Sequence, residues 1–237
     1  MDIKSVLSSI DIKNDIAVMN IYGDIVSSEW DRWSEEDICP GFVSDFLNET
    51  KGKELHVHIN SGGGSAFAGV AIYNLLKARE GKTVTYVDAL AASAASVIAL
   101  AGDEMIMPTG AMLMIHKPWS IATGNSDELR KLADDLDKIA ESYVEVYKDN
   151  LVNADDLDKI KEMMAAETWL SAEDCTGIFK NAVAETGAQA CACVMSESIK
   201  HYKLPAGIKF ESDVKKPDGD ELEKMKMELE IEEALLM

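Results

Sequence analysis

Positive charge is scarce in this sequence, and long apolar runs are missing from it. The 237 residues include 23 lysines and arginines against 43 aspartates and glutamates, which gives a formal net charge of −20. Non-specific binding to nucleic acid or to an anionic membrane needs clustered cations, so the composition argues against both kinds of partner. No apolar run approaches the roughly 20 residues that cross a bilayer, and no basic stretch followed by an apolar one opens the chain. We therefore expect a soluble, cytoplasmic protein.

Cysteine is also sparse, and its four positions are Cys39, Cys175, Cys191 and Cys193. Their spacing matches no zinc motif with a second ligand pair, and without a secretion signal we expect reduced thiols. The Cys-Ala-Cys pair leaves a metal site open as an alternative. The glycine-rich stretch at 60–64 lacks the Gly-Lys-Ser/Thr ending of a phosphate loop. The sequence thus predicts neither a metal nor a cofactor for this chain.

Most of the chain alternates between strand-like and helix-like patterns. In one strand-like segment, apolar Leu55, Val57 and Ile59 alternate with polar residues. This alternation of strands and helices predicts an α/β fold with βαβ crossovers. The predicted strands are 16–25, 53–60, 82–90, two within 104–119, and one after a short helix that starts near 171; the other predicted helices are 41–48, 65–80, 93–102, 125–150 and 153–167.

The long helix predicted over 125–150 is amphipathic, and Ser126 is its expected N-cap. Its apolar stripe could face the core or a partner. From about Glu211 the chain contains ten acids and four bases, which indicates a flexible or partner-dependent tail. We therefore expect an N-terminal segment at 1–17, one domain at 18–210, and an acidic tail at 211–237. The apolar stripe of the helix predicted over 125–150 consists of Leu129, Leu132, Leu136, Ile139 and Tyr143.

Three segments carry residues suited to acyl transfer: "NSGGG" at 60–64, "LAASAAS" at 90–96 and "MLMIHKPW" at 112–119. The first two are small-residue turns between a predicted strand and a predicted helix. Such turns expose backbone N–H groups that can stabilise a developing oxyanion. Together with a serine and His116 they form the set of groups that nucleophilic catalysis needs. A single histidine is more often structural, so these segments alone do not establish an active site.

In their order and context, these segments and "ETWLSAED" at 167–174 resemble the Clp protease proteolytic subunit family, especially its shorter phage and prophage members. The resemblance runs from about Ile21 to Val183. It implies a fold built as a spiral of ββα units with a protruding handle helix at about 125–150. It also implies a serine-type endopeptidase that hydrolyses peptide bonds.

The resemblance assigns a nucleophile and a general base. Ser93 and Ser96 both follow Ala-Ala, but the family nucleophile lies nine residues before the glycine that ends its helix, which is Gly102 here. Ser93 is therefore the implied nucleophile, and Ser96 is expected to pack one turn later. His116 lies in the family's Met-Ile-His-x-Pro pattern and is the implied general base. His56, His58 and His201 are interpreted as structural or exposed.

The third member of the implied triad departs from the family pattern. Glu167 occupies the position where the family has aspartate, four residues before a Ser-Ala-x-Glu helix start. It is the expected orienting group for the imidazole, with Asp149 and Asp174 as weaker alternatives. The implied oxyanion hole consists of the backbone N–H groups of Gly64 and Ala94.

The resemblance also implies partners. Family members assemble as homo-oligomers, usually two stacked heptameric rings joined through the handle helices, and an AAA+ unfoldase that uses ATP supplies unfolded protein substrates. Two other functions remain open at this stage. A phage member could process scaffold or capsid proteins as a head-maturation protease, or serve only in assembly. Crotonase-like hydratases, which act on coenzyme A thioesters, share the spiral architecture.

Overall fold

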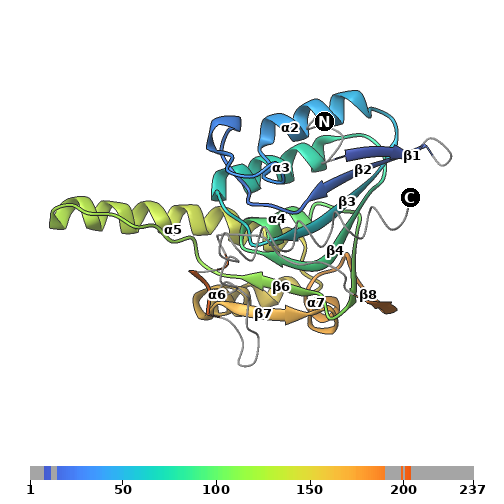
Figure 1. The fold of residues 1–237 in the computed structure, drawn as a ribbon. Coiled ribbons are helices and arrows are strands. Elements are labelled where there is room, and N and C mark those ends of the chain that lie inside the picture. Colours follow the sequence, from blue (N-terminus) through green and yellow to red (C-terminus); the bar gives the residue numbers. More distant parts are fainter. Residues whose placement is uncertain (1–7, 12–14, 190–198, 200, 204–237) are drawn as a thin grey trace, which may run out of the picture. The chain divides into compact units, whose positions relative to one another are not determined.

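The computed structural model describes residues 8–11, 15–189, 199 and 201–203 (Figure 1). The chain divides into two units, Met1–Lys203 and Leu204–Met237, and every described residue belongs to the first. The predicted acidic tail therefore lies outside the described residues, as do Cys191 and Cys193. The other two cysteines, Cys39 and Cys175, are buried and free. None of the helices among the described residues combines the length and the apolar character that crossing a bilayer requires.

A central sheet with helices packed on it confirms the predicted α/β class (Figure 1). Its main path runs β1-β2-β3-β4-β5-β8, with β6 pairing to β4 and β7 to β6. The predicted alternation in β3 is confirmed, because Leu55, Val57 and Ile59 are each 0% exposed. The strands are β1 (Ser8–Asp11), β2 (Ile16–Ile21), β3 (Glu54–Ser61), β4 (Thr83–Ala92), β5 (Glu104–Thr109), β6 (Met112–Ile115), β7 (Thr168–Ser171) and β8 (Ala182–Gln189).

Strand β4 is long enough to pair with two different strands along its length. Its first half pairs in parallel with β5, at Val84–Tyr86, and its last three residues, Leu90–Ala92, pair in parallel with β6. β3 runs parallel to β4 on its other side. The carboxyl ends of β3, β4 and β6 therefore lie at one edge of the sheet, where the ligand sites of parallel sheets are usually found.

The helices largely follow the predicted ranges. Helix α5 begins at Ser126, but its N-cap is Asn125, so the prediction of Ser126 as the cap was wrong. The Asn125 side chain accepts from the N–H groups of Asp127 and Glu128, and Glu128 closes a capping box. The helical elements are η1 (Glu29–Asp31), α2 (Pro40–Glu49), α3 (Ala66–Ala78), α4 (Ala94–Ala99), α5 (Ser126–Asp149), η2 (Ala154–Asp156), α6 (Leu157–Ala166) and α7 (Ala172–Ile178).

Only the inner end of α5 joins the hydrophobic core. Tyr143 and Tyr147 are buried there, whereas the first half of the helix extends away from the sheet (Figure 1). Of the predicted apolar stripe, Tyr143 faces the core and Leu129 is 43% exposed. Leu132, Leu136 and Ile139 are only partly buried. The stripe therefore divides into a core-facing end and an outer part that the described residues cover only partly.

Two strands differ from expectation. β7 follows directly on α6 and was not predicted, because its four residues carry no clear alternation. β1 was also missed; it pairs antiparallel with β2.

Candidate active site

The structure brings the predicted site residues together at the edge where β3, β4 and β6 end. β3 leads into the glycine turn at 62–64, β4 leads into Ser93, and β6 leads into His116. The register explains the convergence, since Ser61 is level with Ala91 and Ala92 is level with Met114. Sequence-distant residues thus become neighbours because parallel strands end together.

Ser93 lies in a tight turn between β4 and α4. Its backbone has φ 54° and ψ −121°, a conformation that costs a non-glycine residue about 1–3 kcal/mol and tends to occur at functional sites. Its N–H donates to the Met114 carbonyl at 2.9 Å, which fixes the turn against β6. The Ser93 Oγ lies 2.7 Å from His116 Nε2, and both residues are buried.

Ser96 has a different environment and no path to the pocket. It is 0% exposed, and its hydroxyl donates to the Ser93 carbonyl at 2.6 Å. Because that single proton is used, the Tyr147 hydroxyl, 2.8 Å away, donates to the Ser96 oxygen. Ser96 therefore packs beneath the turn, as predicted, and helps to hold the backbone of Ser93.

His116 is buried beside Ser93, and burial affects its protonation. Burial lowers the pKa of His116 below its usual value of 6.5, and the nearby charge of Glu167 acts in the opposite direction. The net lowering keeps the imidazole neutral at neutral pH, which is the form that a general base needs. The histidines in β3 serve elsewhere: His58 contacts Asp88 at 3.0 Å and stacks on Tyr86.

Glu167 reaches the site through β7. Ile115 is level with Thr168 in the antiparallel β6–β7 pair, so the residues just beyond them, His116 and Glu167, lie across from one another. Glu167 has a left-handed backbone, with φ 53°, and ends α6. Among the described residues, its carboxylate accepts a hydrogen bond from the N–H of Lys203, and no hydrogen bond joins it to His116.

Neither alternative carboxylate has a described contact with His116. Asp174 accepts from the Ser171 hydroxyl at 2.6 Å and completes the capping box of α7. This hydrogen bonding lowers the pKa of Asp174. Asp149 is exposed at the end of α5. Of the three candidates, Glu167 is the one whose charge acts on His116.

The glycine turn packs against the backbone of Ser93. A Cβ on Gly63 would lie 2.8 Å from the Ser93 Cβ and 3.0 Å from the Ala94 nitrogen. The turn is held in place because Gly63 O accepts from Ile25 N and Ile25 O accepts from Ser65 N, both at 2.7 Å. Within the described part of the chain, the N–H groups of Gly64 and Ala94 make no backbone hydrogen bond outside regular elements. No backbone partner named above competes for these two N–H groups, and their role as oxyanion donors stays a prediction.

Because of this close approach, Gly63→Ala tests whether the glycine turn supports the site. We expect it to lower kcat/KM for a peptide substrate by about 10²-fold or more, because the added methyl must displace the backbone of Ser93 and Ala94. Gly81→Ala is the matched control, since Gly81 has the same φ of +96° but its Cβ would meet Lys53 O at an ordinary 3.4 Å. The control should lose about 1 kcal/mol of stability and no kcat/KM. A Gly63→Ala enzyme with unchanged kcat/KM would contradict this role.

A pocket of about 380 Å³ opens beside the Ser93–His116 pair. Its walls include several residues that sequence reasoning missed: Trp119, Tyr143 and Tyr202. His201, interpreted as structural or exposed, also lines it. No motif marks Tyr202, because it follows the resembling region and reaches the pocket only through folding. Among the described residues, no group of three or more acidic, histidine or cysteine side chains is placed to hold a metal ion.

Comparisons with known sequences identify relatives of this chain. The chain is 29% identical over 126 residues to the ATP-dependent Clp protease proteolytic subunit of Bacteroides thetaiotaomicron, covering 52% of this chain and 56% of that protein. It is 30% identical over 138 residues to the protein of the same name from Ligilactobacillus salivarius, covering 54% and 68%. The match thus spans little more than half the length of the Bacteroides protein. The sequence profile of the Clp protease family matches residues 25–180, more than half of the chain. This protein belongs to the Clp protease family.

Proposed function

We propose that this protein is a serine endopeptidase that hydrolyses peptide bonds of unfolded protein substrates. The observation that carries the proposal is the 2.7 Å contact between Ser93 Oγ and His116 Nε2 at the end of two paired parallel strands. The strained backbone of Ser93 and the neutral state favoured for His116 support the same roles. Glu167 is the proposed orienting carboxylate.

In the proposed reaction, Ser93 Oγ attacks the carbonyl carbon of the scissile bond while His116 Nε2 takes the hydroxyl proton. The N–H groups of Gly64 and Ala94 stabilise the resulting oxyanion. The carbon–nitrogen bond then breaks as His116 returns the proton to the leaving amine. Water hydrolyses the acyl-enzyme by the same route and restores Ser93. Each step uses groups of this chain and needs no cofactor.

We extend the proposal to assembly. The relatives are named proteolytic subunits of an ATP-dependent protease, which supports a homo-oligomer, in the form of stacked heptameric rings, supplied by an ATP-driven unfoldase. The outer half of α5 supports such an assembly, because its apolar side chains include Leu129, which is 43% exposed. The substrate would enter as an unfolded chain.

The first test of the proposal is labelling with a fluorophosphonate probe, followed by peptide mapping of the modified residue. Probe attached to Ser93 would support the nucleophile assignment, since only an activated serine reacts. Cleavage of a fluorogenic peptide by the same sample would support the peptidase activity. Absence of both signals from an assembled sample would overturn the proposal in favour of a role in assembly alone.

The pH dependence of kcat/KM gives a second test. As pH falls, His116 takes up a proton and can no longer accept one from Ser93, so the rate falls with decreasing pH. Because burial lowers the pKa of His116, the acidic inflection should lie below the usual 6.5. The measurement is the kcat/KM profile of a neutral peptide substrate between about pH 4 and 8. An inflection above 6.5 would show that another group is titrating or that the imidazole is more exposed.

A further inference from the structure

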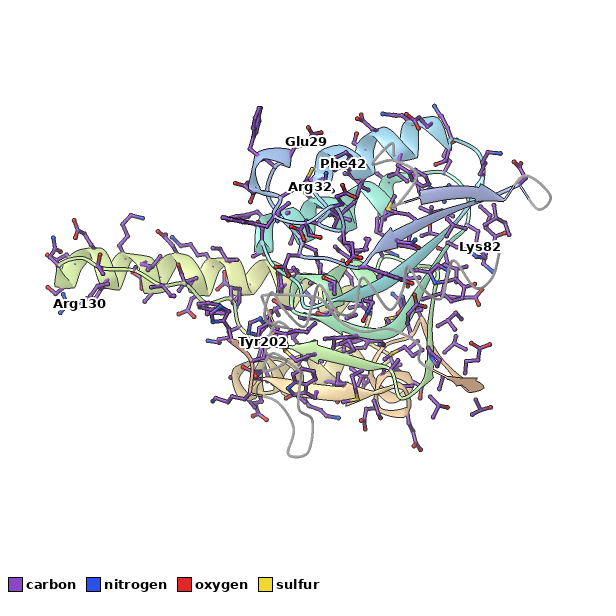
Figure 2. The ribbon with its side chains drawn as sticks, viewed as in Figure 1. Glu29, Arg32, Phe42, Lys82, Arg130 and Tyr202 are labelled. Carbon is purple, nitrogen blue, oxygen red and sulfur yellow. The ribbon has the colours of Figure 1, made fainter. Side chains whose placement is uncertain are left out.

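The candidate active site contains a short segment of the chain's own C-terminal region. Figure 2 shows Tyr202 beside β6 and the inner end of α5. The Tyr202 hydroxyl donates to the Gly62 carbonyl at 2.7 Å, and its ring meets the His116 ring edge-on with centroids 5.1 Å apart. Burial raises the pKa of Tyr202 to about 12, so the hydroxyl stays protonated as a donor. One side chain therefore touches both the glycine turn and the general base.

The backbone of the next residue is bound as a peptide ligand would be. The N–H of Lys203 donates to the Glu167 carboxylate, and its carbonyl accepts from Trp169 Nε1 at 3.0 Å. Main-chain hydrogen bonds combined with a side chain in a pocket are the usual mode of extended-peptide recognition. On the other side of Tyr202, the His201 ring contacts Trp119 with centroids 4.6 Å apart.

These contacts have two consequences for catalysis. Tyr202 forms part of the pocket wall beside Ser93 and His116, and its ring lies against the His116 ring, so it narrows the space that a substrate carbonyl would have to enter. In addition, Oε1 of Glu167 accepts from the Lys203 N–H, and in this arrangement no hydrogen bond joins Glu167 to His116. The segment thus narrows the pocket at the Ser93–His116 pair, and it binds Glu167 in a position where Glu167 makes no hydrogen bond to His116.

We propose that His201–Lys203 is an intramolecular ligand of the active-site pocket, which competes with peptide substrates and withholds Glu167 from His116 until it is displaced. The pocket is accordingly suited to a peptide with an aromatic, hydroxyl-bearing side chain followed by a free backbone N–H. This inference rests on the proposed peptidase function.

The test uses full-length protein and two chemical reactions. Diethyl pyrocarbonate modifies accessible neutral histidines, so its rate at His116 reports whether the pocket is covered, with His56 and His58 as internal references. A fluorophosphonate probe reports the reactivity of Ser93. Both rates are measured by mass spectrometry on four proteins: the natural sequence, Tyr202→Ala, Lys203→Pro and Lys203→Ala.

Tyr202→Ala removes the hydrogen bond to Gly62 and the ring contact, whereas Lys203→Pro removes the N–H that Glu167 accepts. We expect each to raise the modification rate of His116 and the labelling rate of Ser93 by about tenfold, which corresponds to the loss of one or two such contacts. Lys203→Ala retains the backbone N–H and should behave like the natural sequence.

The outcomes separate this inference from the proposed function. Equal His116 modification rates in all four proteins would overturn the intramolecular ligand. Faster His116 modification in Tyr202→Ala and Lys203→Pro, without any Ser93 labelling, would support the ligand but contradict the peptidase. A rise in Lys203→Ala equal to that in Lys203→Pro would show that the backbone bond to Glu167 does not hold the segment, and would overturn its part in the proposal.

Discussion

Ser93→Ala is expected to abolish fluorophosphonate labelling and to lower kcat for peptide hydrolysis by about 10⁶-fold, as loss of a triad nucleophile does elsewhere. Only Ser93 places its hydroxyl within hydrogen-bond distance of His116 Nε2, among the serines that the structure describes. Alanine supports the same turn, because its backbone has the same conformational cost as serine at φ 54°. The measurements are label stoichiometry and kcat, with circular dichroism to confirm folding.

Ser96→Ala is the matched control, because it removes a hydroxyl three residues away with the same preceding Ala-Ala. We expect it to retain labelling but to lower the free energy of unfolding by about 1–3 kcal/mol, since the buried Tyr147 hydroxyl loses its acceptor. Adding Tyr147→Phe should recover part of that loss, because removing both partners leaves no unpaired group. Label on Ser96 in the Ser93→Ala protein would reverse the assignment of the nucleophile.

The choice between these two serines shows how much of the candidate site could be predicted from the sequence. Counting nine residues back from Gly102 separated them, although the local Ala-Ala-Ser pattern did not. The structure gives the physical reason, because Ser93 directly follows the end of β4 beside β6, whereas Ser96 lies one helical turn inside the core. Strand alternation in β3 and helical spacing in α3 were strong enough to predict from local pattern alone.

The parts that could not be predicted depend on long-range pairing. β7 has four residues with no alternation of their own, and it becomes a strand because β6 offers it an antiparallel partner. The approach of Glu167 to His116 follows from that pairing. From the sequence, only the family resemblance could predict it. Tyr202 lies still further from its contact, since its hydrogen bond to Gly62 spans 140 positions. No local property of a sequence encodes such a contact.

Glu167→Gln is expected to lower kcat by about 10²- to 10⁴-fold, the range seen when the carboxylate behind a catalytic histidine loses its charge. Glutamine keeps the side-chain length and an oxygen that can still accept from the Lys203 N–H, so the segment at 201–203 should stay in place. What is lost is the negative charge that favours the imidazolium formed during attack. The measurement is kcat in steady state, with Asp149→Asn as the control because Asp149 is exposed at the end of α5.

Glu167→Gln should also shift the pH profile of kcat/KM. Such a shift is not expected if Glu167 has only a structural role. The charge of Glu167 raises the pKa of His116 against the larger lowering caused by burial. Removing that charge therefore shifts the acidic inflection of kcat/KM to still lower pH. If both kcat and the inflection were unchanged in Glu167→Gln, another carboxylate would have to orient His116. If kcat fell without any change in the inflection, Glu167 would act by supporting the left-handed turn into β7 rather than through its charge.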